Sequence, residues 1–110
     1  MATQKILSKK TRTLVEKYLD KVQASGIEVS KALVFGSHAT GQAGKDSDID
    51  LAVVSSDFGR DYHRELVTLF KLVDTETREL EPIPFSPQGL KDKYNPLASE
   101  VRRYGVPIYP

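Results

Sequence analysis

Apolar residues near the N-terminus recur every three to four positions, which predicts an amphipathic helix over about residues 8–25. Its apolar positions are Leu14, Val15, Tyr18, Leu19 and Val22. Gly26 follows at the position where a left-handed residue commonly ends a helix. The opposite face is rich in Lys and Arg mixed with Glu16 and Asp20. We interpret it as a solvated face, the alternative being a surface for phosphate or an acidic partner.

Three short apolar runs bounded by turn-forming residues predict strands. They cover about residues 29–35, 48–54 and 80–85, and the first ends directly before a Gly-Ser pair. The third run contains Pro82 and Pro84, which both remove a backbone donor from the same edge of the strand. We therefore expect this strand at the margin of the sheet.

The remaining pattern predicts helices between and after these strands. One helix is expected over about residues 60–73, with Asp57 or Asp61 as its cap. Its expected buried stripe consists of Tyr62, Leu66, Leu69, Phe70 and Val73. Two more helices should begin at the pairs Ser86-Pro87 and Asn95-Pro96.

Gly105 should end the last of these helices, before a short strand over residues 106–109. This order of elements predicts a small α/β or α+β fold with one sheet. At 110 residues we expect a single domain over residues 1–110.

Composition narrows the class of protein. With 39% hydrophobic and 28% charged residues, the chain is typical of a globular protein. The absence of cysteine excludes disulfides, thiolate zinc sites and a cysteine nucleophile, and fits the reducing cytoplasm. No apolar run is long enough for a membrane span or a signal peptide, so we expect no membrane partner. A net charge of +1 does not favour nucleic-acid binding.

Two polar motifs stand at a fixed distance along the chain. Gly36-Ser37 follows the first strand, and Asp48-Ile49-Asp50 opens the second, with ten residues between Ser37 and Asp48. Either motif alone is commonly only a turn or a pair of loop carboxylates that bind nearby backbone. On a strand, however, Asp48 and Asp50 share one face, about 6.6 Å apart along the strand, within reach of two metal ions. Carboxylate oxygens suit Mg²⁺ or Mn²⁺.

Glu81 is the candidate for a third carboxylate. On the third strand it shares a face with Ile83 and Phe85, and this order of acidic then apolar residues matches the second strand. Such a pattern indicates a solvent-exposed polar site at one end of a sheet face that is otherwise packed with apolar residues. The alternative is an exposed glutamate beside Glu79 on an edge strand.

The spaced motif resembles that of the DNA polymerase β-type nucleotidyltransferases. The string from Phe35 to Gly41, followed by the residues from Ser47 to Leu51, is similar to the minimal nucleotidyltransferases in particular. These are small bacterial and archaeal proteins that are commonly paired with a helical HEPN partner in toxin–antitoxin operons. The resemblance covers roughly residues 31–105 and implies a polymerase β-like fold, a small mixed sheet flanked by helices.

The resemblance also implies an activity: transfer of a nucleoside monophosphate from a nucleoside triphosphate to a hydroxyl acceptor, with release of pyrophosphate. We expect AMP from ATP, although the residues leave the base open. It assigns metal binding and catalysis to Asp48, Asp50 and Glu81. It assigns nucleotide binding to Gly36, Ser37 and His38. This chain departs from the family at His38 and Thr40, where basic residues are common, and in using glutamate as the third acid. These departures weaken the expected phosphate contacts.

Larger relatives carry a second domain that holds the acceptor, and this chain is too short for one. We therefore expect a partner to supply that surface in a homo- or hetero-oligomer. The preferred interpretation is an antitoxin that adenylylates a hydroxyl, such as that of a tyrosine, on a HEPN-type toxin. One alternative is a binding antitoxin or scaffold without catalysis, with a contact surface formed by Tyr94, Tyr104, Ile108 and Tyr109. Another is a small-molecule transferase of the aminoglycoside type.

Overall fold

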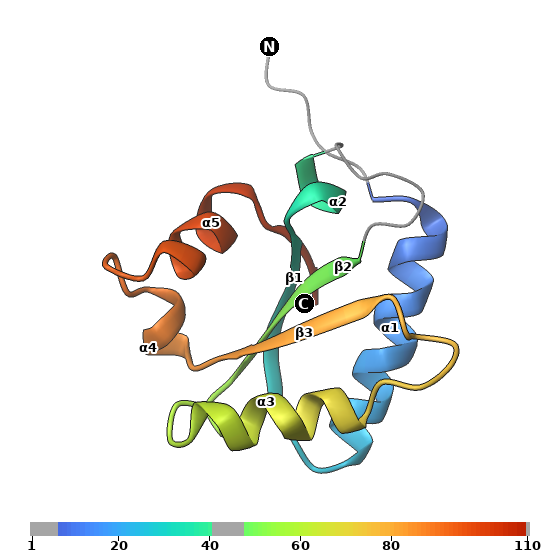
Figure 1. The fold of residues 1–110 in the computed structure, drawn as a ribbon, viewed down its shortest axis with the longest axis horizontal. Coiled ribbons are helices and arrows are strands. Elements are labelled where there is room, and N and C mark those ends of the chain that lie inside the picture. Colours follow the sequence, from blue (N-terminus) through green and yellow to red (C-terminus); the bar gives the residue numbers. More distant parts are fainter. Residues whose placement is uncertain (1–6, 41–47, 110) are drawn as a thin grey trace.

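Apart from one short helix between the first two strands, helices and strands follow one another in the order that the sequence predicts (Figure 1). The computed structural model describes residues 7–40 and 48–109. Its elements are α1 (Lys9–Ala24), β1 (Val29–Phe35), α2 (Ser37–Thr40), β2 (Ile49–Ser55), α3 (Tyr62–Lys71), β3 (Leu80–Phe85), α4 (Pro87–Leu90), α5 (Pro96–Tyr104) and β4 (Val106–Tyr109). Within the described ranges, no helix combines the length and the apolarity that a membrane span requires.

The helix starts are fixed by short polar side chains that accept backbone N–H groups. Ser8 Oγ accepts from Thr11 N at 3.1 Å, and Asp61 Oδ1 accepts from Arg64 N at 3.1 Å. Ser86 and Asn95 cap α4 and α5 in the same way, each followed by proline in the first turn. The predicted starts of these two helices are therefore confirmed, and Asp61 rather than Asp57 caps α3.

Four strands form one mixed sheet in the order β3-β2-β1-β4. Strand β1 pairs antiparallel with both β2 and β4, whereas β2 and β3 run parallel. Strand β3 lies at the margin, which confirms the prediction made from its two prolines. The parallel register places Asp50 beside Glu81 and Leu51 beside Pro82.

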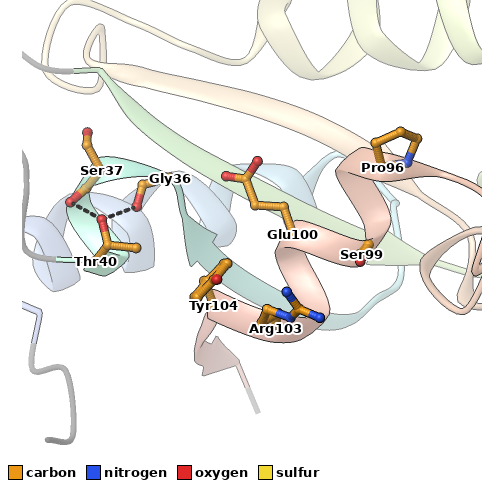
Figure 2. Close-up of a pocket in the computed structure, with 8 residues that line it drawn as sticks. All are labelled: Gly36, Ser37, Thr40, Pro96, Ser99, Glu100, Arg103 and Tyr104. Carbon is orange, nitrogen blue, oxygen red and sulfur yellow. Dashed lines mark hydrogen bonds between the residues drawn. The ribbon is translucent and has the colours of Figure 1, made fainter.

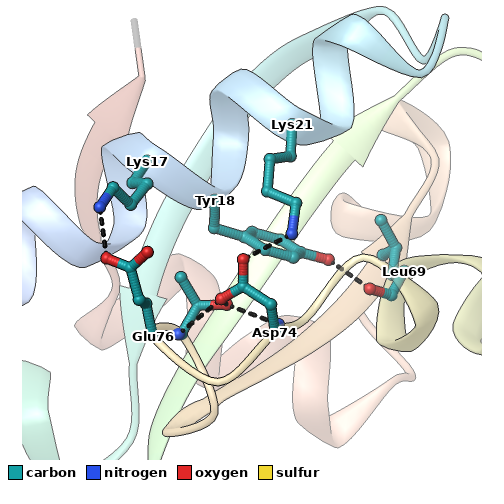
Figure 3. Close-up of polar contacts among 7 residues, drawn as sticks. Lys17, Tyr18, Lys21, Leu69, Asp74 and Glu76 are labelled. Carbon is teal, nitrogen blue, oxygen red and sulfur yellow. Dashed lines mark hydrogen bonds and ion pairs between the residues drawn. The ribbon is translucent and has the colours of Figure 1, made fainter.

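One face of the sheet packs against α1 and α3. Alternate residues of β2, namely Ile49, Leu51 and Val53, point into this layer. Tyr18 of α1 is fully buried here, and its hydroxyl donates to the Leu69 carbonyl of α3 at 2.7 Å (Figure 3). Because burial disfavours the charged phenolate, the pKa of Tyr18 is raised. This bond ties the two helices together beneath the sheet.

The other face of the sheet packs against α4 and α5. Its apolar residues are Leu33, Phe35, Ala52, Val54, Phe85, Ala98 and Val101. Ala52 and Val54 share this face with Asp50, and Phe85 shares it with Glu81. The predicted arrangement, in which acidic residues precede an apolar stretch on the same face of both strands, is therefore confirmed.

The predicted buried stripe of α3 is wrong for Tyr62 and Phe70, while Leu66 and Val73 are half-buried. Only Leu69 is fully buried, while the side chains of Tyr62 and Phe70 are 55% and 42% exposed. Helix α3 packs on the edge strand β3, so the sheet covers only a narrow part of its surface. The core instead includes Phe58, which lies in the turn before α3, outside any periodic pattern.

Two lysines of the basic face of α1 contact the loop that leads into β3 (Figure 3). Lys17 pairs with Glu76 at 2.5 Å, and Lys21 pairs with Asp74 at 2.7 Å. The hydrogen bond from Lys21, followed by one from the Thr77 backbone, lowers the pKa of Asp74 to about 2. Exposed pairs contribute little stability, but these contacts hold the loop that precedes Glu81.

Candidate active site

Gly36 forms the turn that joins β1 to the short helix α2. Its φ of +74° lies in the left-handed region, which glycine adopts without steric cost. The Gly36 carbonyl accepts from the backbone N–H groups of Ala39 at 3.1 Å and Thr40 at 3.2 Å. Ser37 and His38 therefore lie on a single helical turn directly after the strand. Residues 41–47, which separate this turn from Asp48, lie outside the described part of the chain.

Asp50 lies between the Gly36 turn and Glu81. In the sheet it is opposite Phe35 on β1 and beside Glu81 on β3. A Cβ atom added to Gly36 would overlap Asp50 Oδ2 and lie 3.2 Å from Asp50 Cγ. The carboxylate of Asp50 thus packs directly against the glycine, and a larger residue at position 36 would displace it.

The three predicted carboxylates interact with one another. The pKa of Glu81 is raised, first by a hydrogen bond with Asp48, then by burial and by the charges of Asp48 and Asp50. Such mutual repulsion is what a bound cation would relieve. Within residues 7–40 and 48–109, however, no group of three or more His, Asp or Glu side chains is arranged to hold a metal ion. Asp48, Asp50 and Glu81 are therefore close to one another, but their side chains are not arranged in the geometry of a metal site.

A fourth acidic residue, Glu100 of α5, also acts on this group. The pKa of Asp50 is raised by burial first, then by the charges of Glu100 and Asp48, while His38 acts in the opposite direction. Sequence reasoning missed Glu100. The available signal was a polar stripe along α5, because Ser99, Glu100 and Arg103 lie within one helical turn of one another on the same face.

A cavity of about 490 Å³ separates the Gly36 turn from α5 (Figure 2). One wall consists of Gly36, Ser37 and Thr40, and the opposite wall consists of Pro96, Ser99, Glu100, Arg103 and Tyr104. In Figure 2 the Glu100 side chain extends from α5 toward the strands, between the two walls. The cavity therefore lies beside Asp50, with backbone and hydroxyl groups on one wall and charged side chains on the other.

We expect Glu81→Gln to stabilise the metal-free protein at neutral pH. Because the folded-state pKa of Glu81 is raised, its stabilising contribution is present below the unfolded-state pKa and is lost as the pH rises through the folded-state pKa. At pH 7 the substitution removes a like charge beside Asp48 and Asp50. Cross-strand charge pairs suggest a gain of about 0.2–1 kcal/mol.

Thermal unfolding in EDTA between pH 4 and 8 measures this effect. The advantage of Glu81→Gln over the unchanged protein should shrink as the pH falls. Glu79→Gln removes a charge two residues away and serves as the matched control. A lower or equal melting temperature of Glu81→Gln at pH 7 would contradict the repulsion.

Comparison with known proteins gives a family and two structural neighbours. The model of the family "Polymerase beta, Nucleotidyltransferase" matches residues 15–109. Comparison with curated proteins gives no match. A Sulfolobus solfataricus protein provisionally assigned as a nucleotidyltransferase aligns with a TM-score of 0.63 and 17% identity, over 87% of this chain and 77% of that chain.

The second neighbour comes from a crystal structure described as a toxin-antitoxin with AMP-PNP. It aligns with a TM-score of 0.57 and 16% identity, over 93% of this chain and 73% of that chain. At these identities the two neighbours show the shared fold alone, and the family match covers most of the sequence. The protein therefore belongs to the polymerase β-type nucleotidyltransferase family.

Proposed function

We propose that this chain transfers AMP from ATP to a hydroxyl group of a HEPN-type partner protein, as the antitoxin of a toxin–antitoxin pair. The observation that carries the proposal is the contact between the Gly36 turn and Asp50, with Glu81 in register beside Asp50. Family membership supports nucleotidyl transfer. The structural neighbour described as a toxin-antitoxin with AMP-PNP supports an adenine nucleotide and a protein partner.

Asp48, Asp50 and Glu81 are the residues that would hold divalent metal ions. Their donor chemistry fits, because hard carboxylate oxygens suit Mg²⁺ or Mn²⁺ and no cysteine is present. Burial raises the pKa of Asp50, a hydrogen bond with Asp48 raises the pKa of Glu81, and the neighbouring negative charges raise both further, which a cation would offset. When bound, the metal would neutralise charge on the carboxylates and phosphates and polarise the α-phosphate.

The chain's own residues have separate tasks in this proposal. Gly36 lets the backbone approach the phosphates, and Ser37 offers its hydroxyl and backbone N–H to them. Glu81 accepts the proton of the acceptor hydroxyl. The acceptor oxygen then forms a bond to the α-phosphorus while the bond from that phosphorus to the bridging oxygen of pyrophosphate breaks. Pyrophosphate leaves with the electrons of that bond.

The experiment combines the purified chain with ATP, Mg²⁺ and the helical protein encoded beside it, if that protein carries an Arg-x-x-x-x-His motif. Mass spectrometry should show an adenylyl group on a hydroxyl of the partner, and none when EDTA is present. A stable complex without modification would instead favour the binding-antitoxin function. Tyr94, which is 83% exposed, and Tyr104, which is 50% exposed, offer a contact surface for that alternative.

Calorimetry tests the nucleotide site without the partner. ATP binding should disappear in EDTA and return with Mg²⁺ or Mn²⁺. Binding of ATP that does not depend on metal would contradict the assignment of Asp48, Asp50 and Glu81. An absence of binding under every condition would contradict the nucleotidyltransferase activity itself.

A further inference from the structure

We propose that Arg103 of α5 binds the terminal phosphates of the nucleotide, from the wall of the cavity opposite the Gly36 turn. This inference rests on the proposed function and adds a substrate-binding residue outside the motif of Gly36, Ser37, Asp48 and Asp50. It follows from the charges that line the cavity and from the contacts that Arg103 and its neighbour make.

The lining of the cavity presents little positive charge to a polyphosphate. Gly36, Ser37 and Thr40 form the uncharged wall. Glu100 adds a negative charge on the other wall, and Asp50 lies directly behind Gly36. Among the described residues that line this cavity, Arg103 alone carries a fixed positive charge. ATP brings a charge of about −4, so this guanidinium is the side-chain group that attracts it.

Arg103 is available for a ligand, whereas the adjacent Arg102 is not. The Arg102 guanidinium donates to the carbonyl oxygens of Leu90 and Asp92, and so joins α5 to the segment after α4. The side chain of Arg103 is exposed and makes no hydrogen bond or ion pair with any residue in the described ranges 7–40 and 48–109. Two adjacent arginines thus have different surroundings: Arg102 is held by backbone carbonyls, whereas Arg103 lines the cavity with an exposed side chain.

The position of Arg103 on α5 suits a phosphate contact. It lies one helical turn after Ser99 and Glu100, and all three residues line the cavity. In Figure 2 its guanidinium lies along the outer side of α5, from which the exposed side chain can rotate over the cavity mouth. The planar fork of arginine can bind two phosphate oxygens through two parallel N–H groups, a geometry that the single ammonium nitrogen of lysine does not offer.

Calorimetry with ATP and with AMP, both in Mg²⁺, tests the inference. Arg103→Gln should weaken ATP binding by about 10–100-fold, the loss expected for charge-assisted hydrogen bonds. AMP binding should change by less than about threefold, because AMP lacks the terminal phosphates. Arg103→Lys, which keeps the charge without the fork, should recover part of the ATP affinity. All variants should match the unchanged protein in melting temperature within about 2 °C, because the exposed Arg103 side chain makes no hydrogen bond or ion pair in the described part of the chain.

Arg102→Gln is the matched control, since it removes the same charge at the next position. It should lower the melting temperature through the lost contacts with Leu90 and Asp92, while ATP affinity in the folded protein changes by less than about threefold. Equal ATP affinity of Arg103→Gln and the unchanged protein would overturn the inference alone. Equal losses for ATP and AMP would also overturn it, because the residue would then not recognise terminal phosphates. Failure of the unchanged protein to bind ATP would overturn the proposed function as well.

Discussion

Replacement of Asp48 and Asp50 together by asparagine is expected to lower nucleotidyl transfer by about a thousandfold or more while the chain stays folded. Metal ions bound by such carboxylates stabilise a phosphoryl-transfer transition state by several kcal/mol. Each 1.36 kcal/mol corresponds to a tenfold change in rate, so a loss of about 4 kcal/mol gives this factor. Folding should be preserved because asparagine has nearly the same shape and removes charges that repel Glu81 and Glu100.

The rate of AMP transfer to the partner protein, together with a thermal unfolding curve for each variant, measures this prediction. Asp20→Asn is the control, because Asp20 is exposed on α1 at a distance from the acidic group. The control should keep full activity. If the Asp48 and Asp50 double variant kept its activity within tenfold, these residues would have no place in the mechanism.

The elements of the fold that depend on local chemistry could be predicted from the sequence. Ser8, Ser86 and Asn95 begin helices because a short polar side chain satisfies backbone donors within three residues. Pro82 and Pro84 indicate the edge position of β3 because their missing donors exclude a central strand. In each case the deciding interaction lies within a few residues along the chain or in the backbone itself.

The elements that depend on how distant segments pack could not be predicted. The burial of α3 depends on how much of its surface the sheet covers, and an edge strand covers little of it. Glu100 acts on Asp50 only because α5 packs back across the sheet beside the Gly36 turn. The sequence places Asp50 and Glu81 on the same face, but their direct pairing depends on the parallel register of β2 and β3.

Gly36 links fold and site, and Gly36→Ala is expected to damage both. At a φ of +74°, alanine is strained by about 1–3 kcal/mol. Its Cβ would also overlap Asp50 Oδ2, so either Asp50 or the turn must move, at a cost of about 1–3 kcal/mol more. A shift of about 1 Å in a catalytic group commonly costs about a hundredfold in rate, and we expect a loss of transfer of that size.

Gly26→Ala separates the two causes, because Gly26 has a φ of +101° and nothing within 4 Å of the added Cβ. It should lose about 1–3 kcal/mol of stability from backbone strain and keep full transfer activity. Urea unfolding and the transfer rate, measured for both variants, test the difference. If Gly36→Ala were no less active than Gly26→Ala, the contact between Gly36 and Asp50 would have no role in the reaction. A third result is that both variants lose equal free energy of unfolding but only Gly36→Ala loses transfer activity. In that case the displacement of Asp50 costs no stability. The position of Asp50 would then matter to catalysis more than to folding.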